Sequence, residues 1–228
     1  MKNKKETLVI GIGGGGQNIL NQLKEQVSDD FRLIVINSDE QILNFSDTDK
    51  ILFPTEWKIF KKFSSKGLKT KLKYFVNSIF CSKPSLGCGG DVSEGEILAK
   101  KYKSLLKDEL KKAGNVFVIS TFGGGFGTGT TPVIVDYIKQ FNINPITFIT
   151  VPFGFEGKRR SLNADLGIEK LKNDNLVIIN NDKCIEAMDK KVSAKEAFAM
   201  VNSAIITKVL DIHKKKRVAD MLTKEFEE

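Results

Sequence analysis

Two glycine clusters, each placed between a buried strand and a helix, are the feature that most restricts what this chain can fold into. The first lies at residues 13–16, after an apolar run at 7–12, and the second lies at 123–129, after an apolar run at 116–120. Without Cβ atoms a backbone turns sharply and brings its N–H groups against an anion, and the positive end of the following helix points at the same place. Each cluster therefore predicts a phosphate-binding loop.

Around these clusters, short apolar runs alternate with longer amphipathic stretches, which is typical of a parallel sheet wrapped by helices. The expected fold class is α/β, a three-layer, doubly wound and mainly parallel Rossmann-like sheet that ends in a long central helix. A length of 228 residues suits one well-cored domain over 1–228, with a basic insertion at 44–84 and a central helix and charged tail at 194–228. Strands are expected at 7–12, 33–36, 116–120, 146–151 and 176–179, and helices at 18–26, 132–140, 161–172 and 194–213.

Taken alone, the first cluster fits the pattern Gly-x-Gly-x-x-Gly at residues 11–16, with Asp39 at the end of the next expected strand. That combination is typical of a Rossmann-type NAD(P)-binding oxidoreductase domain, which is the alternative interpretation. Such a domain needs no second phosphate cradle, whereas two cradles on neighbouring strands predict one polyphosphate gripped from two sides. The absence of a Gly-x-x-x-x-Gly-Lys-Ser/Thr pattern argues against a Walker-type NTPase.

Two further features surround the second cluster. Thr130, Thr131 and Pro132 suit the cap and first turn of the helix that follows it. A third glycine-rich loop, at residues 87–95, also precedes a helix. Three unrelated tight turns would be the purely structural interpretation of these loops.

The net charge of +8 is concentrated in one segment. Residues 57–83 contain eight lysines and no acidic residue, so this segment carries the whole excess. A local patch favours a local partner over nucleic acid. Leu68, Leu72 and Phe75 fall at helical spacing within it, which fits a helical insertion packed on the domain. The alternatives are contact with an acidic partner or with an anionic membrane surface.

The remaining composition predicts a cytoplasmic protein without a metal site. No apolar run approaches the roughly 20 residues of a membrane span, and the charged N-terminus lacks the hydrophobic region of a signal peptide. Cys81, Cys88 and Cys184 show no metal-ligand spacing and are expected to be free thiols. His213 lies in a basic helical stretch and is expected to be solvated. We therefore predict no catalytic residue and no protein metal ligand within this chain.

Several motifs together resemble one known family. Residues 123–129, Gly-Gly-Gly-Phe-Gly-Thr-Gly, resemble the tubulin/FtsZ signature Gly-Gly-Gly-Thr-Gly-Thr-Gly. Residues 152–160, Pro-Phe-Gly-Phe-Glu-Gly-Lys-Arg-Arg, are similar to the bacterial FtsZ stretch Pro-Phe-x-Phe-Glu-Gly-Lys-Lys-Arg. Four more matches fall in FtsZ order, at 13–18, at 37–39, at 181–183 and at Ala197, Phe198 and Asn202. The likeness runs from about residue 7 to about residue 208, with a gap between 43 and 86.

This resemblance implies that the ligand is GTP or GDP. Residues 14–17 and 123–128 would cradle the phosphates, and Gly89 and Gly90 would close over the γ-phosphate. Mg²⁺ would be held mainly by phosphates and water, since the sequence shows no dedicated carboxylate cluster. The nucleotide-binding residues that the resemblance implies are Gly14, Gly15, Gly16, Gln17, Asn18, Gly89, Gly90, Gly123, Gly124, Gly125, Gly127, Thr128, Glu156, Arg160, Phe198 and Asn202.

The resemblance also assigns roles at the nucleoside end. Asn18 and Asn202 would hydrogen-bond guanine, and Phe198 would stack on it. Glu156 would accept from the ribose hydroxyls, and Arg160 would approach the ribose or a phosphate. Adenine would leave the amide groups unpaired, at a cost of about 1–3 kcal/mol per group. The structural alternatives are a core position for Phe198 and helix-end positions for the asparagines. For Glu156 and Arg160 the alternative is a solvated charged loop.

The chain also departs from the family. Phe126 replaces a signature threonine and places a bulky ring near the phosphates. The FtsZ pattern Asn-x-Asp-x-x-Asp, which acts on the nucleotide of a neighbouring subunit, does not follow Asn202. Hydrolysis is therefore expected to need a partner in trans. We expect association with itself or with a full-length FtsZ-type protein, as a filament component or as a modulator that caps one end. The other interpretation is that this chain is the N-terminal part of a longer polymer-forming GTPase.

Overall fold

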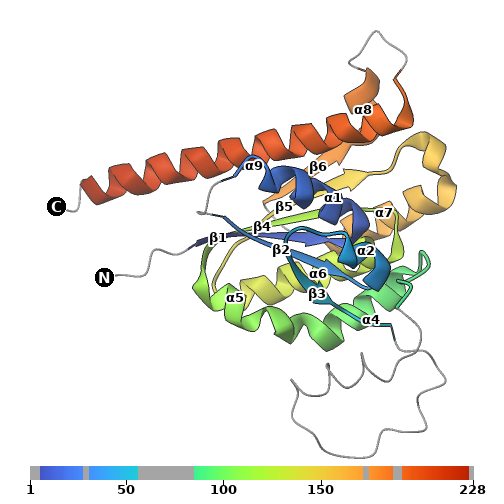
Figure 1. Cartoon of the computed structure of the whole chain (residues 1–228), viewed down its shortest axis with the longest axis horizontal. Coiled ribbons are helices and arrows are strands. Elements are labelled where there is room, and N and C mark those ends of the chain that lie inside the picture. The colour runs from blue at the N-terminus through green and yellow to red at the C-terminus, as the bar shows by residue number, and fades with distance from the viewer. Residues whose placement is uncertain (1–5, 28–30, 56–84, 172–174, 187–191, 226–228) are drawn as a thin grey trace, which may run out of the picture.

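A computed structural model of the chain describes residues 6–27, 31–55, 85–171, 175–186 and 192–225 (Figure 1). The lysine-rich segment at 57–83 lies outside the described residues, so the expectations attached to it are not addressed by the structure. Within the described residues, no helix combines the length and the apolar character that a membrane span requires.

The described residues form a parallel sheet of six strands in the order β3-β2-β1-β4-β5-β6. The chain starts in the middle with β1, moves outward to β3, returns to β4 beside β1 and then continues to β6. The order therefore reverses between β1 and β4, and the predicted α/β fold class is confirmed. The strands are β1 (Glu6–Ile12), β2 (Phe31–Asn37), β3 (Asp49–Leu52), β4 (Ala113–Thr121), β5 (Ile146–Val151) and β6 (Leu176–Asn180).

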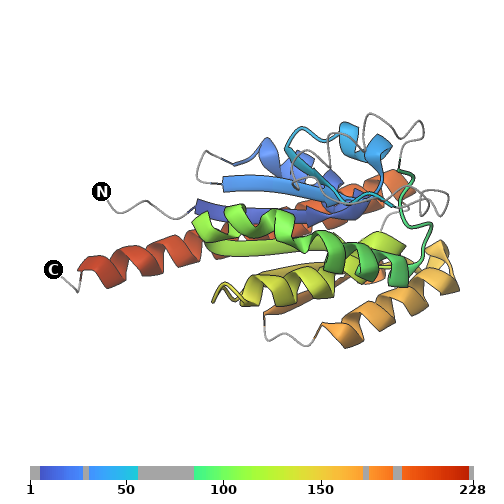
Figure 2. The ribbon, with the colours of Figure 1, turned by 90° about the horizontal axis from the view of Figure 1, so that it is seen from below.

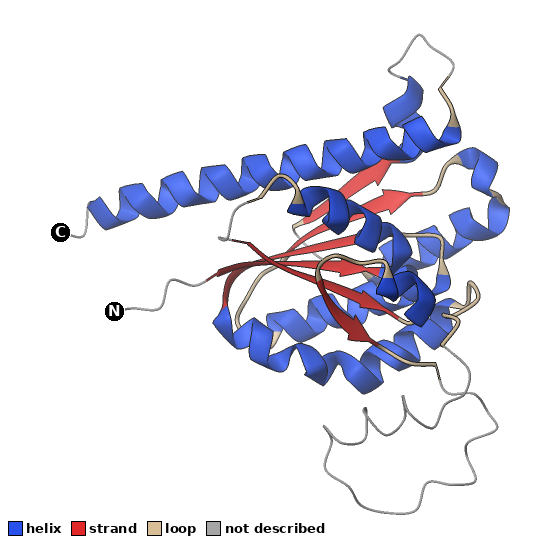
Figure 3. Cartoon of the chain, in the orientation of Figure 1, coloured by secondary structure: helices blue, strands red, loops and turns tan. Residues whose placement is uncertain are grey.

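Helices cover both faces of the sheet (Figure 3). Figure 1 shows α1 (Gly13–Lys24) and α9 (Ala194–Glu225) above the sheet and α4 (Val92–Tyr102), α5 (Lys107–Lys112) and α6 (Gly125–Lys139) below it. Figure 2 shows α7 (Lys158–Lys170) beside α6, and these two helices are in contact. The other described helical segments are α2 (Glu40–Asn44), η2 (Lys103–Leu106), η3 (Gly154–Glu156) and α8 (Asn181–Glu186).

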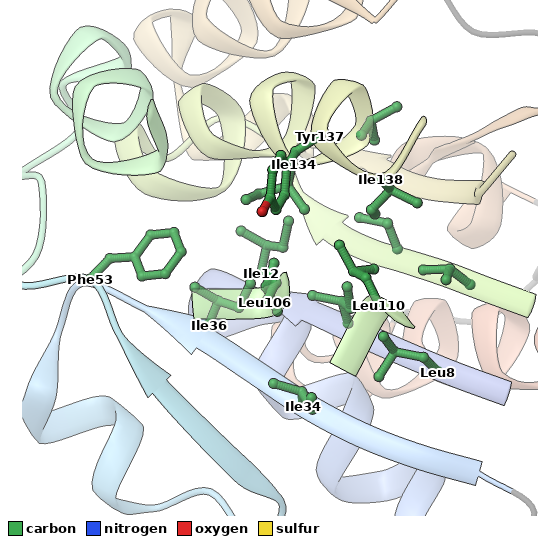
Figure 4. Close-up of a cluster of buried hydrophobic side chains, with 14 of the residues drawn as sticks. Leu8, Ile12, Ile34, Ile36, Phe53, Leu106, Leu110, Ile134, Tyr137 and Ile138 are labelled. Atoms are coloured by element: carbon green, nitrogen blue, oxygen red, sulfur yellow. The ribbon is translucent and has the colours of Figure 1, made fainter. Parts of the chain in front are cut away.

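Two hydrophobic clusters hold these layers together. Leu8 and Ile10 of β1 pack on the α4 and α6 side, whereas Val9 packs on the α1 and α9 side. Figure 4 shows Leu8 within the first of these clusters. Successive side chains of a strand point to opposite faces, so a strand that is covered on both faces needs an uninterrupted apolar run. This is why β1 and the middle of β4 were predictable from sequence. The short edge strand β3 begins with two exposed charged residues, was not predicted, and lies within the range assigned to the insertion.

More of each glycine cluster is helical than the sequence predicted. α1 begins at Gly13 instead of residue 18, and α6 begins at Gly125 instead of residue 132. The predicted cap by Thr130, Thr131 and Pro132 is therefore wrong, because these residues lie inside α6. Each glycine costs a helix about 1 kcal/mol relative to alanine, but close packing of the helix starts outweighs that local preference. The helix α9 is 32 residues long, which is longer than expected.

Candidate functional site

A cleft of about 450 Å³ lies where the strand order reverses, at the carboxyl ends of the strands. Its walls come from the segments that follow β1, β2, β4, β5 and β6, together with the start of α9. Open parallel sheets bind ligands at this position, and the volume lies within the roughly 300–1,000 Å³ of small-molecule sites. The cleft is therefore the candidate functional site.

The starts of α1 and α6 face this cleft side by side. A Cβ atom at Gly13 would lie 3.5 Å from the backbone nitrogen of Gly127, so the first turns of the two helices adjoin. Neither helix has an acidic residue in its first turn, and neither N-cap makes a side-chain hydrogen bond. The first N–H groups of a helix have no partner within the helix and carry a partial positive charge. Two such ends aimed at one cleft make it a candidate anion-binding site.

Only some glycines of the cleft leave room for a ligand. A Cβ atom at Gly89 or Gly124 would meet no atom within 4 Å, and one at Gly14 would lie 3.8 Å from the Ile42 side chain. These three glycines line the cleft, so a side chain at any of them would occupy space that a ligand could fill. At Gly15, by contrast, a Cβ atom would overlap the side chain of Thr121.

A third loop closes the cleft on the side of α4. Gly87, Gly89 and Gly90 adopt φ angles of +77°, +55° and +83°, a region that other residues rarely adopt. Between them, the Cys88 sulfur lies 3.4 Å from the Ser38 hydroxyl, and burial raises the pKa of this thiol to about 11. The loop leads directly into α4, so its position is tied to that helix.

The start of α9 forms the other end of the cleft. Phe198 is 41% exposed and lines the cleft with Asn202. The buried ring of Phe153 supports it edge-on, with ring centroids 4.9 Å apart. Glu156 accepts from the backbone N–H of Phe153 at 2.9 Å and forms an ion pair with Arg160. This end therefore offers an aromatic surface, amide groups and a paired charge.

Two buried polar atoms of the cleft residues have no partner among the described residues. They are the Asn37 side-chain nitrogen and the Asn181 side-chain oxygen, and both residues line the cleft. A buried polar group without a hydrogen bond costs about 1–3 kcal/mol. A polar ligand that reached either atom would remove that cost. Neither asparagine was among the predicted site residues, although each follows or ends a predicted strand, which was the available signal.

The structure brings twelve of the sixteen predicted residues to one cleft. They are Gly14, Gly15, Asn18, Gly89, Gly90, Gly124, Gly125, Gly127, Glu156, Arg160, Phe198 and Asn202.

The other four predicted residues, Gly16, Gln17, Gly123 and Thr128, are not among the cleft lining and support the loops from behind. The Gln17 amide nitrogen donates to the Ile42 carbonyl oxygen at 2.6 Å, and the Thr128 hydroxyl accepts from the Gly123 backbone nitrogen at 2.9 Å.

Phe126 causes no conflict with the cleft. Its ring is buried in the hydrophobic cluster below the sheet, where it meets the Phe53 ring edge-on at a centroid distance of 6.0 Å. Part of the residue still lines the cleft. The phenylalanine therefore contributes to the core without closing the site.

Among the described residues, no three or more His, Cys, Asp or Glu side chains gather in a way that could hold a metal ion. The carboxylates of the described cleft lining, Asp39 and Glu156, are both engaged. Asp39 accepts from the Ile42 N–H at the start of α2, and Glu156 is held by its backbone and ion-pair contacts. The described lining thus carries the Asp39 and Glu156 carboxylates and the Arg160 guanidinium beside the two helix N-termini.

The fold and this cleft define a Rossmann-like α/β protein with a candidate anion site at paired helix N-termini. The family described as Tubulin/FtsZ family, GTPase domain, matches residues 6–189. The chain belongs to the Tubulin/FtsZ family, which confirms the resemblance seen in its motifs.

Solved structures of similar fold superpose on the chain. The FtsZ dimer of M. jannaschii shares 30% identity with a TM-score of 0.72, over 92% of this chain and 54% of that one. CetZ2 from Haloferax volcanii, as a GTPγS-bound protofilament, shares 19% sequence identity with a TM-score of 0.68. The match covers 90% of this chain and 57% of CetZ2. TubZ of Clostridium botulinum phage c-st, with its C-terminal tail truncated, shares 19% sequence identity with a TM-score of 0.61. The match covers 92% of this chain and 60% of TubZ.

The chain thus spans little more than half the length of these proteins. The two at 19% identity show the fold alone. The NAD(P)-binding alternative finds no support among these matches.

Proposed function

We propose that this chain binds GTP and GDP, with the polyphosphate across the starts of α1 and α6 and the guanine against α9. The observation that carries this proposal is the pair of adjoining helix N-termini, both free of acidic residues in their first turns. Membership of a family of GTPase domains supplies the class of nucleotide. The described cleft has the volume that such a ligand requires, and the positive ends of two helices face it.

Recognition of the base would rest on α9 and the asparagines. Phe198 offers an exposed ring at the cleft, and the amides of Asn18, Asn181 and Asn202 line the same space. An amide supplies both a donor and an acceptor, which matches the adjacent carbonyl and N–H groups of guanine. Adenine presents a different pattern and would leave these groups unpaired, a difference of about 1–3 kcal/mol per group.

The rest of the nucleotide would be held by the backbone and by one ion pair. Glu156 and Arg160 stand together at the edge of the cleft, where the carboxylate suits ribose hydroxyls and the guanidinium suits a phosphate. Mg²⁺, when bound, would neutralise phosphate charge and would be held mainly by phosphate oxygens and water.

We further propose that the chain associates with itself or with a full-length FtsZ-type protein, as a filament component or modulator. The M. jannaschii FtsZ structure is a dimer, and the CetZ2 structure is a protofilament. Both carboxylates of the described cleft lining are engaged in other contacts. A group that activates water for hydrolysis would accordingly come from a neighbouring subunit. In sedimentation experiments with GTP, the chain should pellet either by itself or together with full-length FtsZ. If it pelleted in neither case, this proposal would be contradicted.

Thermal unfolding with GTP, GDP, ATP and NAD tests the nucleotide assignment. A ligand at 100 times its Kd stabilises the folded state by about 2.7 kcal/mol, so GTP and GDP should raise the Tm by several degrees. ATP and NAD at the same concentration should leave the Tm unchanged. Equal shifts with ATP would contradict guanine recognition, and a shift with NAD alone would restore the dinucleotide alternative.

A further inference from the structure

One side chain outside the cleft lining joins two of the glycine loops. The Asn163 amide nitrogen, on α7, donates to the carbonyl oxygens of Gly90 and Gly123, each at 3.1 Å. Both partners are carbonyl oxygens, which only accept, so the amide must present its NH₂ group to them. Both N–H groups of this half-buried amide are then used. Asn163 thereby connects α7 to the loop before α4 and to the loop before α6.

These two loops already lie in close contact at that point. A Cβ atom at Gly125 would lie 2.6 Å from the Asp91 backbone nitrogen, so the backbones of the two loops touch. The Gly123 N–H donates to the Thr128 hydroxyl at 2.9 Å, and the Gly123 carbonyl is held by Asn163. Both polar groups of this glycine are fixed, although its φ of +105° belongs to a conformation that only glycine adopts easily.

This contact has a consequence for the anion site. In a trans peptide the N–H of one residue points opposite to the C=O of the residue before it. The Gly123 carbonyl points to Asn163, so the N–H of Gly124 points away from Asn163. Gly124 is the N-cap of α6 and lines the cleft. The Asn163 amide therefore restricts the rotation of the Gly123–Gly124 peptide, which adjoins the cleft.

The position of the Asn163 contacts indicates which part of a bound nucleotide would lie near them. α9 lies on one face of the sheet, whereas α4, α6 and α7 lie on the other. A nucleotide with its base at α9 and its first phosphates between α1 and α6 would reach the Gly90 loop with its last phosphate. Arg159, one turn before Asn163, places a guanidinium nitrogen 3.4 Å from where a Gly90 Cβ would lie. The face of α7 with these two side chains thus meets the loop.

We propose that Asn163 is a positioning residue that makes the cleft prefer a nucleoside triphosphate over the diphosphate. This inference rests on the proposed binding of guanine nucleotides. The Asn163 amide fixes the Gly90 loop and the Gly123–Gly124 peptide relative to each other. It thereby keeps both of them beside the last phosphate of the bound nucleotide. A purely structural role would weaken the binding of both nucleotides equally, whereas a positioning role at the last phosphate weakens that of the triphosphate more.

The test is calorimetric titration of the full chain with GTPγS and GDP. Asn163→Ala, which keeps good helix propensity, should raise the Kd for GTPγS about tenfold and the Kd for GDP by less than about threefold. Asn163→Gln keeps the donors and should restore most of the preference. Leu162→Ala, at an exposed apolar position on the same helix, is the matched control and should bind like the wild type.

A second measurement follows the loop without ligand. Hydrogen exchange of the Asp91 amide, which donates to the Cys88 carbonyl at 2.9 Å, should be about tenfold faster in Asn163→Ala than in Leu162→Ala. Asn163→Ser, with one hydroxyl donor, should fall between wild type and alanine in both measurements. An unchanged ratio of the two Kd values in Asn163→Ala would overturn the inference. Absence of binding by the wild type would instead overturn the proposed function.

Discussion

The two glycine clusters are similar in sequence but serve different neighbours. In the first, a Cβ atom at Gly16 would lie 2.7 Å from the Ile119 carbonyl oxygen, so the glycine allows α1 to lie directly on β4. In the second, a Cβ atom at Gly129 would overlap the Val92 carbonyl oxygen, so the glycine allows α4 to cross α6. One cluster packs a helix on the sheet, and the other packs a helix on a helix.

Both clusters also contain glycines that pack against little or nothing. Gly14 in the first and Gly124 in the second face the cleft with space around the missing side chain. A glycine-rich motif therefore mixes two kinds of position, one that packing requires and one that a ligand requires. Substitutions should separate them, because the first kind changes stability and the second kind changes affinity.

The largest effect is expected at the crossing of α4 and α6. Gly129→Ala would force apart two helix backbones, which cannot move aside as a side chain could, and should lower the free energy of unfolding by about 3 kcal/mol. Urea unfolding measures this difference. Gly124→Ala is the matched control in the same motif and should lose less than about 0.5 kcal/mol. Equal losses in the two variants would contradict the division of the second cluster into packing and ligand positions.

The next effect concerns the loop that α4 carries. Because burial raises the pKa of Cys88 to about 11, its thiolate is scarce at pH 8. Alkylation by iodoacetamide should be about 20-fold slower than for a thiol of ordinary pKa, and should accelerate as the pH rises towards 11. The rate is measured with Cys81 and Cys184 replaced by serine. Saturating GDP should slow it further, and alkylation as fast as that of a small thiol would show that the loop lies open.

A smaller effect is expected at the open position of the second cluster. Gly124→Ala would place a methyl group in the cleft at the start of α6 and should raise the Kd for GDP about tenfold. Fluorescence titration with a labelled GDP measures the change. Gly154→Ala, outside the described cleft lining, is the control and should bind GDP as the wild type does. Unchanged affinity in Gly124→Ala would remove the α6 end from the proposed phosphate site.

The smallest effect concerns an ion pair that links α4 to α7. The Lys100 and Lys170 ammonium groups donate to Glu96 at 2.6 Å each and lower the pKa of Glu96 to about 2. Glu96→Gln should lower the free energy of unfolding at pH 7 by no more than about 1 kcal/mol. A lowered pKa stabilises the fold above the unfolded value near 4.5, so the difference should shrink as the pH falls towards 2.

Urea unfolding at several pH values measures this difference. Asp165→Asn, which removes an exposed carboxylate on α7, is the matched control. A difference for Glu96→Gln that stayed constant from pH 7 to pH 2 would contradict the ion-pair explanation.

Sequence patterns predicted those parts of the fold that depend on continuous apolar runs. β1 and β4 are covered on both faces and stand out for that reason, whereas the four residues of β3 carry no comparable pattern. The starts of α1 and α6 were misplaced, because glycine disfavours helices locally and only the packing of Gly16 and Gly129 explains its presence there.

The candidate site was predictable where motifs are contiguous. Most of the residues implied by the family resemblance line the cleft, because each motif ends a strand or begins a helix. Asn163 could not be predicted, since its two partners lie 73 and 40 residues away in the chain. The unpartnered atoms of Asn37 and Asn181 needed the structure as well, because an unpartnered buried atom is a property of three-dimensional packing.

The most direct measurement is a crystal structure of this chain with bound GDP. We predict phosphate oxygens at the backbone N–H groups that begin α1 and α6, and the guanine on Phe198 beside Asn202. Gly16 and Gly129 should touch only protein. Phosphates bound elsewhere, or a base that lies away from α9, would contradict the assignment of the cleft.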